Sequence, residues 1–306
     1  MRLLKNTFHF CLMLLFLCGL SGCATPSSPD VSTQETEHFS DTSETPPSKP
    51  KREPGTIIAI PDFYSPELGT DDNVLRIYLP SDYENTDKSY PVIYMPDGQN
   101  LFSSTTATYG KSWGLGIILD KMKMDKKTDG IIIVGIDVVS ARRTEEYNIY
   151  LDAYHNNGTG LADATSDFYV NTVKPYIDEN YRTLTDREHT AILGSSYGAV
   201  VTINTCIRHP DTFGYVGMFS YCDNQAPERM TTFLKEHMTP ETLNNPYIYF
   251  FTGGYDFAKE STINAYDIAL ENGFEHVLLE QDEDGQHDEY TWSTAFENCL
   301  RFWKWI

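Results

Sequence analysis

Short apolar runs alternate with longer amphipathic stretches along most of the chain. Six runs are almost continuously apolar, as in strands that are covered on both faces of a parallel sheet: residues 92–95, 131–136, 190–193, 216–219, 247–251 and 277–279. Six stretches between and after them are predicted helices: 113–122, 166–180, 197–208, 227–237, 257–272 and 291–305. This alternation predicts a doubly wound α/β sheet, in which ligands bind at the carboxyl ends of the strands.

Two further extended segments precede these runs, at residues 56–60 and 74–79. In the second segment the apolar residues Val74, Leu75, Ile77 and Leu79 alternate with polar ones in the manner of a half-exposed strand. Together with the six apolar runs they predict one sheet over residues 55–306, a length that fits a single large α/β domain.

The first 23 residues have the pattern of a targeting segment. Arg2 and Lys5 begin it, residues 8–20 form an apolar run that is short for a membrane span, and Leu20-Ser21-Gly22-Cys23 ends it. This ending resembles the bacterial lipobox, in which the cysteine becomes the lipidated first residue of the mature protein. We therefore predict a lipoprotein signal peptide over residues 1–23 and acyl chains such as palmitate on Cys23. The alternative is ordinary signal cleavage beside an incidental cysteine.

Residues 24–54 are rich in Ser, Thr, Pro and Glu and hold hardly an apolar side chain. Such a segment buries too little surface to offset its ordering entropy, so we predict a disordered tether. A flexible tether of this length reaches roughly 30 Å. Ala24 follows the lipobox cysteine, which in Gram-negative cells directs a lipoprotein to the outer membrane. The expected location is the cell envelope, lipid-anchored and extracytoplasmic.

Charge and cysteine usage exclude several classes of function. The formal net charge of −21 argues against nucleic acid and against an anionic lipid surface as partner, so the lipid anchor is the expected membrane contact. Cys206, Cys222 and Cys299 lack CxxC spacing, which disfavours a disulfide framework and a zinc site. Buried free thiols are favoured, and a Cys206–Cys222 pair stays open. The acidic loop after residue 279 fits calcium poorly, because an EF-hand alignment puts Thr291 where a glutamate is needed. We expect no metal and no cofactor.

The candidate nucleophile is Ser196. It stands in Gly194-Ser195-Ser196-Tyr197-Gly198, where an apolar run passes directly into a predicted helix. A turn this tight needs small flanking residues and exposes the serine at the carboxyl end of the sheet. The helix behind it directs backbone N–H groups and a positive dipole end to the same place. An ordinary Gly/Ser turn is the alternative, and the strand before and the helix after argue against it.

Two later strand ends supply an acid and a base. Asp256 follows the apolar run at 247–251, and His287 lies in the loop after 277–279. The order Ser196, Asp256, His287 is that of α/β hydrolases, with the histidine activating the serine and the carboxylate orienting the histidine. Asp256 is also consistent with a helix N-cap, and His287 with a solvated loop residue. Asp223 and Glu260 are the substitute acids; the less suitable bases are His155, His189, His209, His237 and His276.

Several motifs together resemble the bacterial putative esterase family of the α/β-hydrolase superfamily, which includes feruloyl and acetyl-xylan esterases, enterochelin esterases, esterase D and mycolyltransferases. They recur in order from about residue 55 to the end: the segment 90–102, Gly135-Ile136-Asp137, Arg143 with Glu146-Tyr147, the segments 174–178 and 181–183, the elbow at 194–198, and His287 with Trp292 and Phe296. The resemblance implies an α/β-hydrolase fold: a mostly parallel central sheet with helices on both faces. Many relatives have glycine where this chain has Ala199.

The resemblance also implies roles for further residues. The backbone N–H groups of Tyr197 and Gln99 are the expected oxyanion hole. Tyr109 and Trp113 are expected to line the substrate pocket, although core packing is an alternative for both. Arg143 is expected to contact substrate, or to brace a loop through an ion pair with Glu146.

The expected function is a serine carboxylic-ester hydrolase that works through an acyl-enzyme. Acetyl or feruloyl polysaccharide esters and siderophore esters are the expected substrates. An acyltransferase of the mycolyltransferase type is one alternative, and a non-catalytic carbohydrate-binding or structural lipoprotein is another. The oligomeric state is left open.

Overall fold

The structure is a computed structural model that describes residues 54–155 and 157–306. The predicted signal peptide over 1–23 and the tether, except its last residue, lie outside the described residues. No helix in the described part of the chain is long and apolar enough to cross a membrane.

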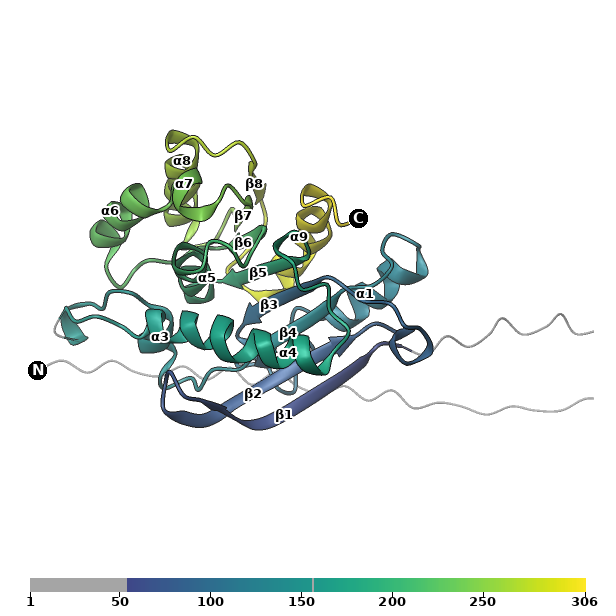
Figure 1. The fold of residues 1–306 in the computed structure, drawn as a ribbon. Coiled ribbons are helices and arrows are strands. Elements are labelled where there is room, and N and C mark those ends of the chain that lie inside the picture. The colour runs from purple at the N-terminus through teal and green to yellow at the C-terminus, as the bar shows by residue number, and fades with distance from the viewer. Residues whose placement is uncertain (1–53, 156) are drawn as a thin grey trace, which may run out of the picture. The chain divides into compact units, whose positions relative to one another are not determined.

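Eight strands form one sheet in the order β1-β2-β4-β3-β5-β6-β7-β8. The pairs β1–β2 and β2–β4 are antiparallel, and the other five pairs are parallel. Figure 1 shows β1 and β2 at one edge of the sheet and β8 at the other. The strands are β1 (Thr56–Ser65), β2 (Thr70–Leu79), β3 (Val92–Pro96), β4 (Ile132–Ile136), β5 (Thr190–Ser195), β6 (Tyr215–Phe219), β7 (Tyr247–Gly253) and β8 (Val277–Asp282).

Each predicted strand is present, and β1 differs most from its prediction. It continues through Pro61 and Asp62 to Ser65, with a register shift between Ile60 and Phe63 and a positive φ of 54° at Asp62. An edge strand tolerates proline because the N–H on its outer side needs no partner. The prediction therefore ended this strand five residues early.

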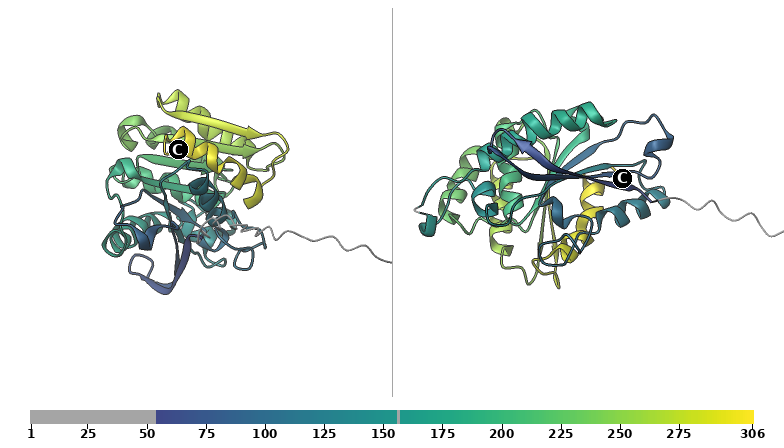
Figure 2. Two further views of the ribbon diagram at one scale, coloured as in Figure 1. Left: turned by 90° about the vertical axis from the view of Figure 1, so that its right-hand side faces the viewer. Right: turned by 90° about the horizontal axis from the view of Figure 1, so that it is seen from below.

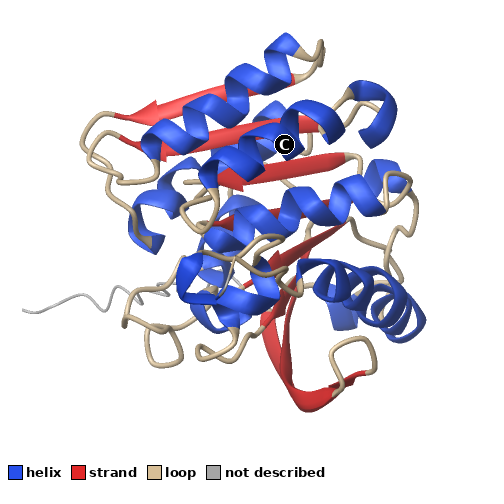
Figure 3. Cartoon of the chain, turned by 90° about the vertical axis from the view of Figure 1, so that its left-hand side faces the viewer, coloured by secondary structure: helices blue, strands red, loops and turns tan. Residues whose placement is uncertain are grey.

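Nine α-helices connect or follow the strands in the described chain, and Figure 3 shows them packed along the sheet. They are α1 (Leu115–Met124), α2 (Arg143–Tyr147), α3 (Ala162–Asp167), α4 (Lys174–Asn180), α5 (Tyr197–Arg208), α6 (Pro227–His237), α7 (Pro240–Leu243), α8 (Lys259–Glu271) and α9 (Glu289–Phe302). The bounds of α5 and α6 agree with the prediction. The predicted helix 166–180 is α3, a π-helical segment Phe168–Val173 and α4 in succession. The short helices α2 and α7 were not predicted, because they are too short to show a periodic pattern of apolar residues.

Helices cover both faces of the sheet, as the right-hand view of Figure 2 shows. On β3 the side chains alternate between the two sides: Val92 and Tyr94 belong to the core beneath α3, α5, α6 and α8, and Ile93 and Met95 to the core beneath α1 and α9. Both cores are fully buried at these positions. Burial on both faces explains why the central strands are apolar throughout. The predicted mostly parallel sheet with helices on both faces is confirmed.

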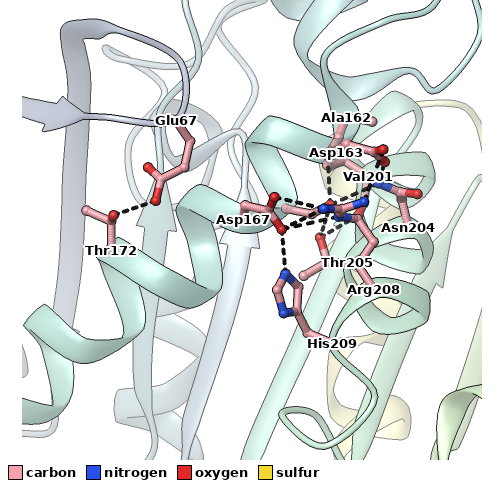
Figure 4. Close-up of polar contacts among 11 residues, drawn as sticks. Glu67, Ala162, Asp163, Asp167, Thr172, Val201, Asn204, Thr205, Arg208 and His209 are labelled. Atoms are coloured by element: carbon pink, nitrogen blue, oxygen red, sulfur yellow. Dashed lines mark hydrogen bonds and ion pairs between the residues drawn. The ribbon is translucent and has the colours of Figure 1, made fainter.

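Polar contacts join α3 to α5 on one of these faces (Figure 4). The Asp167 carboxylate accepts hydrogen bonds from the Arg208 guanidinium and lies 2.8 Å from His209 Nε2, while Asn204 Nδ2 donates to Asp163. His209 caps the carboxyl end of α5, and Ser196 precedes its amino end. This cluster therefore fastens the helix that begins at the candidate nucleophile.

Candidate active site

The turn from β5 to α5 holds Ser196 in a strained conformation, with φ 57° and ψ −128°. A side chain on Gly194 would place its Cβ 2.2 Å from the Gly198 carbonyl oxygen. The sequence therefore needs glycine here for the backbone to fold back on itself. Ser196 is partly exposed, and Tyr197 is the first residue of α5. Its N–H is one of those that the first helical turn leaves without an intrahelical acceptor.

The loop after β3 lies beside this turn. Asp97 is in the left-handed region with φ 60°, and Gly98 to Asn100 form a short 3₁₀-helix. A Cβ on Gly98 would lie 2.6 Å from the Gly135 carbonyl carbon, so the loop packs directly on β4. Gln99 turns its side chain away to accept a hydrogen bond from the Val138 N–H at 3.3 Å. Any oxyanion role of Gln99 is thus left to its backbone N–H.

Asp256 and His287 come together from the ends of β7 and β8. The distance from His287 Nδ1 to Asp256 Oδ1 is 2.7 Å, and the Asp256 side chain is fully buried. His287 also packs against Phe257 and Trp292, with ring centroids 4.1 and 5.1 Å away. The imidazole is therefore oriented by one carboxylate and two rings, with Nε2 left for another partner.

Three groups hold the Asp256 carboxylate. Besides His287, the Ser220 hydroxyl donates to Oδ2 and the Ala258 N–H donates to Oδ1. The Ser220 oxygen in turn accepts a hydrogen bond from Trp292 Nε1 at 2.7 Å. Burial would raise the pKa of Asp256, but the hydrogen bonds from His287 and Ser220 outweigh it and lower the pKa below its ordinary value. The carboxylate is consequently ionised at neutral pH.

Ser196, Tyr197 and His287 line one pocket of about 480 Å³. The other lining residues come from the end of β5, from the segments that follow β3, β4, β6 and β7, and from the start of α9: Asp97, Asn100, Thr108, Tyr109, Ser140, Arg143, Thr144, Ser195, Cys222, Asn224, Phe257, Glu289 and Trp292. Ser196 Oγ makes no hydrogen bond to another described residue. The pocket lies at the carboxyl ends of the parallel strands, where an α/β sheet binds its ligands.

The two aromatic residues predicted to contact substrate lie in different places. Tyr109 lines the pocket and is 83% exposed. Trp113 was predicted wrongly: it does not line the pocket but is buried in the core against Phe219 and Trp292, with ring centroids 5.3 and 5.8 Å away. An aromatic residue after a strand-end loop suits either place, and only packing decides between them.

Arg143 both lines the pocket and braces the loop after β3. Its Nε and Nη2 donate to the two carboxylate oxygens of Asp97 at 2.8 and 2.7 Å. The predicted partner Glu146 instead lies 2.7 Å from Arg142. The bidentate pair therefore joins α2 to the loop that carries Gln99.

The substitute acids and bases lie elsewhere. Asp223 accepts from the Ser261 hydroxyl, and Glu260 is exposed on α8. The N-cap of α8 is Ala258 and not Asp256. The remaining histidines contact Asp152, Asp186, Asp167, Phe233 and Tyr247, in the order His155, His189, His209, His237 and His276.

Cys206, Cys222 and Cys299 are free and buried, so the pairing that the sequence left open does not form. Cys222 lines the pocket, and burial raises the pKa of its thiol to about 11. Within residues 54–155 and 157–306, no group of three or more His, Cys, Asp or Glu side chains is placed to hold a metal ion.

Sequence reasoning missed Ser220, Asn100 and Glu289. Ser220 follows β6 directly with a positive φ of 48° and fixes Asp256, whereas Asn100 and Glu289 meet across the pocket over 189 positions of chain. The place of Ser220 after an apolar run was a readable signal. Nothing in the pattern links Asn100 to Glu289.

The mostly parallel sheet with helices on both faces, and the pocket at the carboxyl ends of its strands, are those of the α/β-hydrolase fold. A ferulic acid esterase structure superposes with a TM-score of 0.65 at 21% identity, covering 82% of this chain and 98% of that chain. An IroE-like serine hydrolase from Shewanella oneidensis superposes with a TM-score of 0.67 at 16% identity, covering 81% and 80%. At such low identity these likenesses concern the fold alone.

The family described as "Putative esterase" matches residues 65–298, and the chain belongs to this family. An endo-1,4-beta-xylanase/feruloyl esterase from Xylanibacter ruminicola is 26% identical over 233 residues, which are 74% of this chain and 28% of that protein. Another curated relative is matched over 62% of its length. The chain thus spans less than two thirds of these relatives.

Proposed function

We propose that this protein is a serine carboxylic-ester hydrolase with Ser196 as nucleophile, His287 as general base and Asp256 as the orienting acid. The observation that carries the proposal is the 2.7 Å contact between His287 Nδ1 and Asp256, with the same imidazole lining one pocket with Ser196. Membership of an esterase family supports the reaction class.

The mechanism follows from this arrangement. His287 Nε2 takes the proton of the Ser196 hydroxyl as Oγ attacks the ester carbonyl carbon, and Asp256 stabilises the resulting imidazolium. The negative charge that forms on the carbonyl oxygen meets the N–H groups of Tyr197 and Gln99 and the positive end of α5. The imidazolium then protonates the departing alkoxide, which leaves an acyl-enzyme. A water molecule, deprotonated by His287, hydrolyses that ester and restores the serine.

The substrates that we propose are acetyl or feruloyl esters on polysaccharide, or siderophore esters. Support for the first comes from the xylanase/feruloyl esterase relative and the ferulic acid esterase structure. The second is supported by the fold that this chain shares with the enterobactin esterase of Shigella flexneri. A pocket of about 480 Å³ lies within the range typical of small-molecule sites.

Hydrolysis of p-nitrophenyl acetate by the wild type and by Ser196→Ala tests the proposal. Removing the nucleophile should lower kcat by about 10⁶-fold, by analogy with other serine hydrolases. Ser293→Ala is the matched control, because its hydroxyl donates to Tyr290 within its own helix. Equal rates for the wild type and Ser196→Ala would refute the mechanism.

We propose further that the mature chain begins at a lipidated Cys23 and is held extracytoplasmically on a membrane, the outer membrane in a Gram-negative cell. The lipobox-like ending and the apolar run before it support this location. Each buried methylene of the acyl chains contributes about 0.8 kcal/mol, so two or three chains anchor a protein firmly.

A further inference from the structure

One buried carboxyl in the pocket has no part in the mechanism above. Glu289 is the first residue of α9, two positions after His287, and lines the same pocket as Ser196. Its relative exposure is 4%, so almost all of it is shielded from bulk water. Acidic side chains are seldom buried to this degree unless they are paired.

The contacts of Glu289 leave one carboxylate oxygen without a side-chain partner among the described residues. Asn100 Nδ2 donates to Oε1 at 3.0 Å, and the Asn100 amide is oriented by the Thr108 N–H, which donates to its Oδ1 at 2.8 Å. Oε2 makes no hydrogen bond to another side chain of the described residues. Asn100 thus holds the carboxyl through Oε1, and Oε2 is left accessible from the pocket.

Neighbouring cations form no ion pair with this carboxyl in the described part of the chain. Lys111 Nζ lies 2.6 Å from Asp288, and Arg143 is paired with both oxygens of Asp97. Burial raises the pKa of Glu289, and the charges of Asp97 and Asp288 raise it further, while a hydrogen bond from its own backbone N–H and the charge of Arg143 lower the pKa by less. Oε2 does not belong to the fully buried side-chain atoms that lack a hydrogen bond, so it is open to the pocket, and a donor from a ligand can take the place of water there.

We propose that Glu289 is a specificity-determining residue that accepts a hydrogen bond from a hydroxyl group of the substrate, next to the ester that Ser196 attacks. The proposal rests on the proposed function. The substrate class is then an ester with a free hydroxyl within reach of the pocket, either a phenol on its acyl side or a polyol on its alcohol side. A hydroxyl suits this site because it costs less to desolvate than a charged group, whereas an anionic acyl group would meet the carboxyl groups of Asp97 and Glu289.

Two matched pairs of esters test the two sides separately. On the acyl side methyl 4-hydroxycinnamate is compared with methyl 4-methoxycinnamate, and on the alcohol side 2-hydroxyethyl acetate with 2-methoxyethyl acetate. In one pair the wild type should favour the free hydroxyl by about 10–100-fold in kcat/KM, as expected for one hydrogen bond to a charged acceptor. The pair that shows the preference tells which side Glu289 contacts.

The deciding variant is Glu289→Gln. Its Oε1 can still accept from Asn100, so the fold should be kept, while its Nε2 replaces the free acceptor with a donor. The preference should fall to about one, mainly through KM. Glu260→Gln, an exposed change on α8, is the control and should keep the wild-type ratio.

Three outcomes would overturn the inference: no preference in either pair, a preference that Glu289→Gln leaves unchanged, or faster cleavage of protonated 2-(dimethylamino)ethyl acetate than of the hydroxyethyl ester. Activity on p-nitrophenyl acetate separates this failure from failure of the proposed function. If the wild type lacks that activity, titration calorimetry with 4-hydroxybenzyl and 4-methoxybenzyl alcohol tests whether Glu289 binds a free hydroxyl group. Tighter binding of the free phenol, lost in Glu289→Gln, sustains the inference, and equal binding refutes it.

Discussion

The backbone of Ser196 lies in a region of φ and ψ that L-residues rarely adopt, at a cost of about 1–3 kcal/mol. Close packing around the turn holds it there. Gly194 and Gly198 are in such close contact that no side chain fits on Gly194. The exposed hydroxyl and the helix N–H groups are thus placed before any substrate arrives.

Gly194→Ala should therefore destabilise the protein by about 2–3 kcal/mol, because its Cβ would overlap a backbone oxygen rather than a movable side chain. It should also lower kcat on p-nitrophenyl acetate, since the turn can relax only by displacing Ser196. Urea denaturation and steady-state kinetics measure both effects. Ser293→Ala serves as the control, and a variant with wild-type stability would contradict the reported contact.

Ser220 acts on the reaction only through Asp256, so we regard it as a positioning residue. Ser220→Ala should lower kcat about tenfold, in line with the loss of one hydrogen bond to a charged group, and leave KM within about twofold. The acid limb of the pH profile of kcat/KM should also move to higher pH. The Asp256 carboxylate loses a hydrogen-bond donor that lowers its pKa, so this pKa rises. An effect confined to thermal stability would show a merely structural role.

At the scale of elements, the site is assembled by segments that follow β3, β4, β5, β6, β7 and β8 and by the amino ends of α5 and α9. The far end of α5 is held by the polar cluster with α3 shown in Figure 4. Burial would raise the pKa of Asp167, but hydrogen bonds from Arg208 and His209 outweigh it and lower the pKa. Ionised Asp167 thus favours the folded state.

The sign of the pH dependence follows from that direction. A lowered pKa in the folded state stabilises the protein above the ordinary aspartate pKa of about 3.9, and the gain is lost as the pH falls through the folded value. Asp167→Asn should lower the free energy of unfolding by about 1 kcal/mol at pH 7 and at pH 5, a size suited to a partly exposed cluster.

Chemical denaturation at pH 7, 5 and 3.5 measures this difference, which should shrink at the lowest pH. Asp284→Asn is a suitable control, because Asp284 is exposed and its carboxylate forms no ion pair in the described chain. A loss that is the same at all three pH values would mean that packing, not charge, links α3 to α5.

Considered as a whole, the molecule has its buried core in the described part of the chain, from Leu75 to Trp303. All the apolar residues of this core follow residue 54. A protein that starts at residue 55 should therefore unfold cooperatively with the same Tm, within about 2 °C, as a protein that starts at Ala24. Calorimetry compares the two, and a clearly lower Tm for the shorter protein would show that the tether contributes to folding.

The membrane anchor is tested at the same scale. Cys23→Ala should move the protein from the membrane fraction to the soluble fraction of the envelope, because no acyl chains can then be attached. Hydrolysis of p-nitrophenyl acetate per molecule should stay unchanged. Membrane retention of the variant would refute lipidation as the anchor.

The order of strands and helices could be predicted from the sequence. Strands that are buried on both faces are apolar throughout, and amphipathic stretches indicate helices. The elbow was equally readable, since a turn that close demands glycine at Gly194, and this requirement is local. Asp256 and His287 could be selected as strand-end residues by their order along the chain.

Contacts between distant segments were decided only in three dimensions. Three contacts depend on how loops from different strands pack at one edge of the sheet. They are the burial of Trp113 in the core, the pairing of Arg143 with Asp97 instead of Glu146, and the hydrogen bond between Asn100 and Glu289. Hydrophobic periodicity indicates which side chains of a helix or strand face the core. It carries no information on which remote side chain will lie opposite, because that partner is set by the packing of the whole domain.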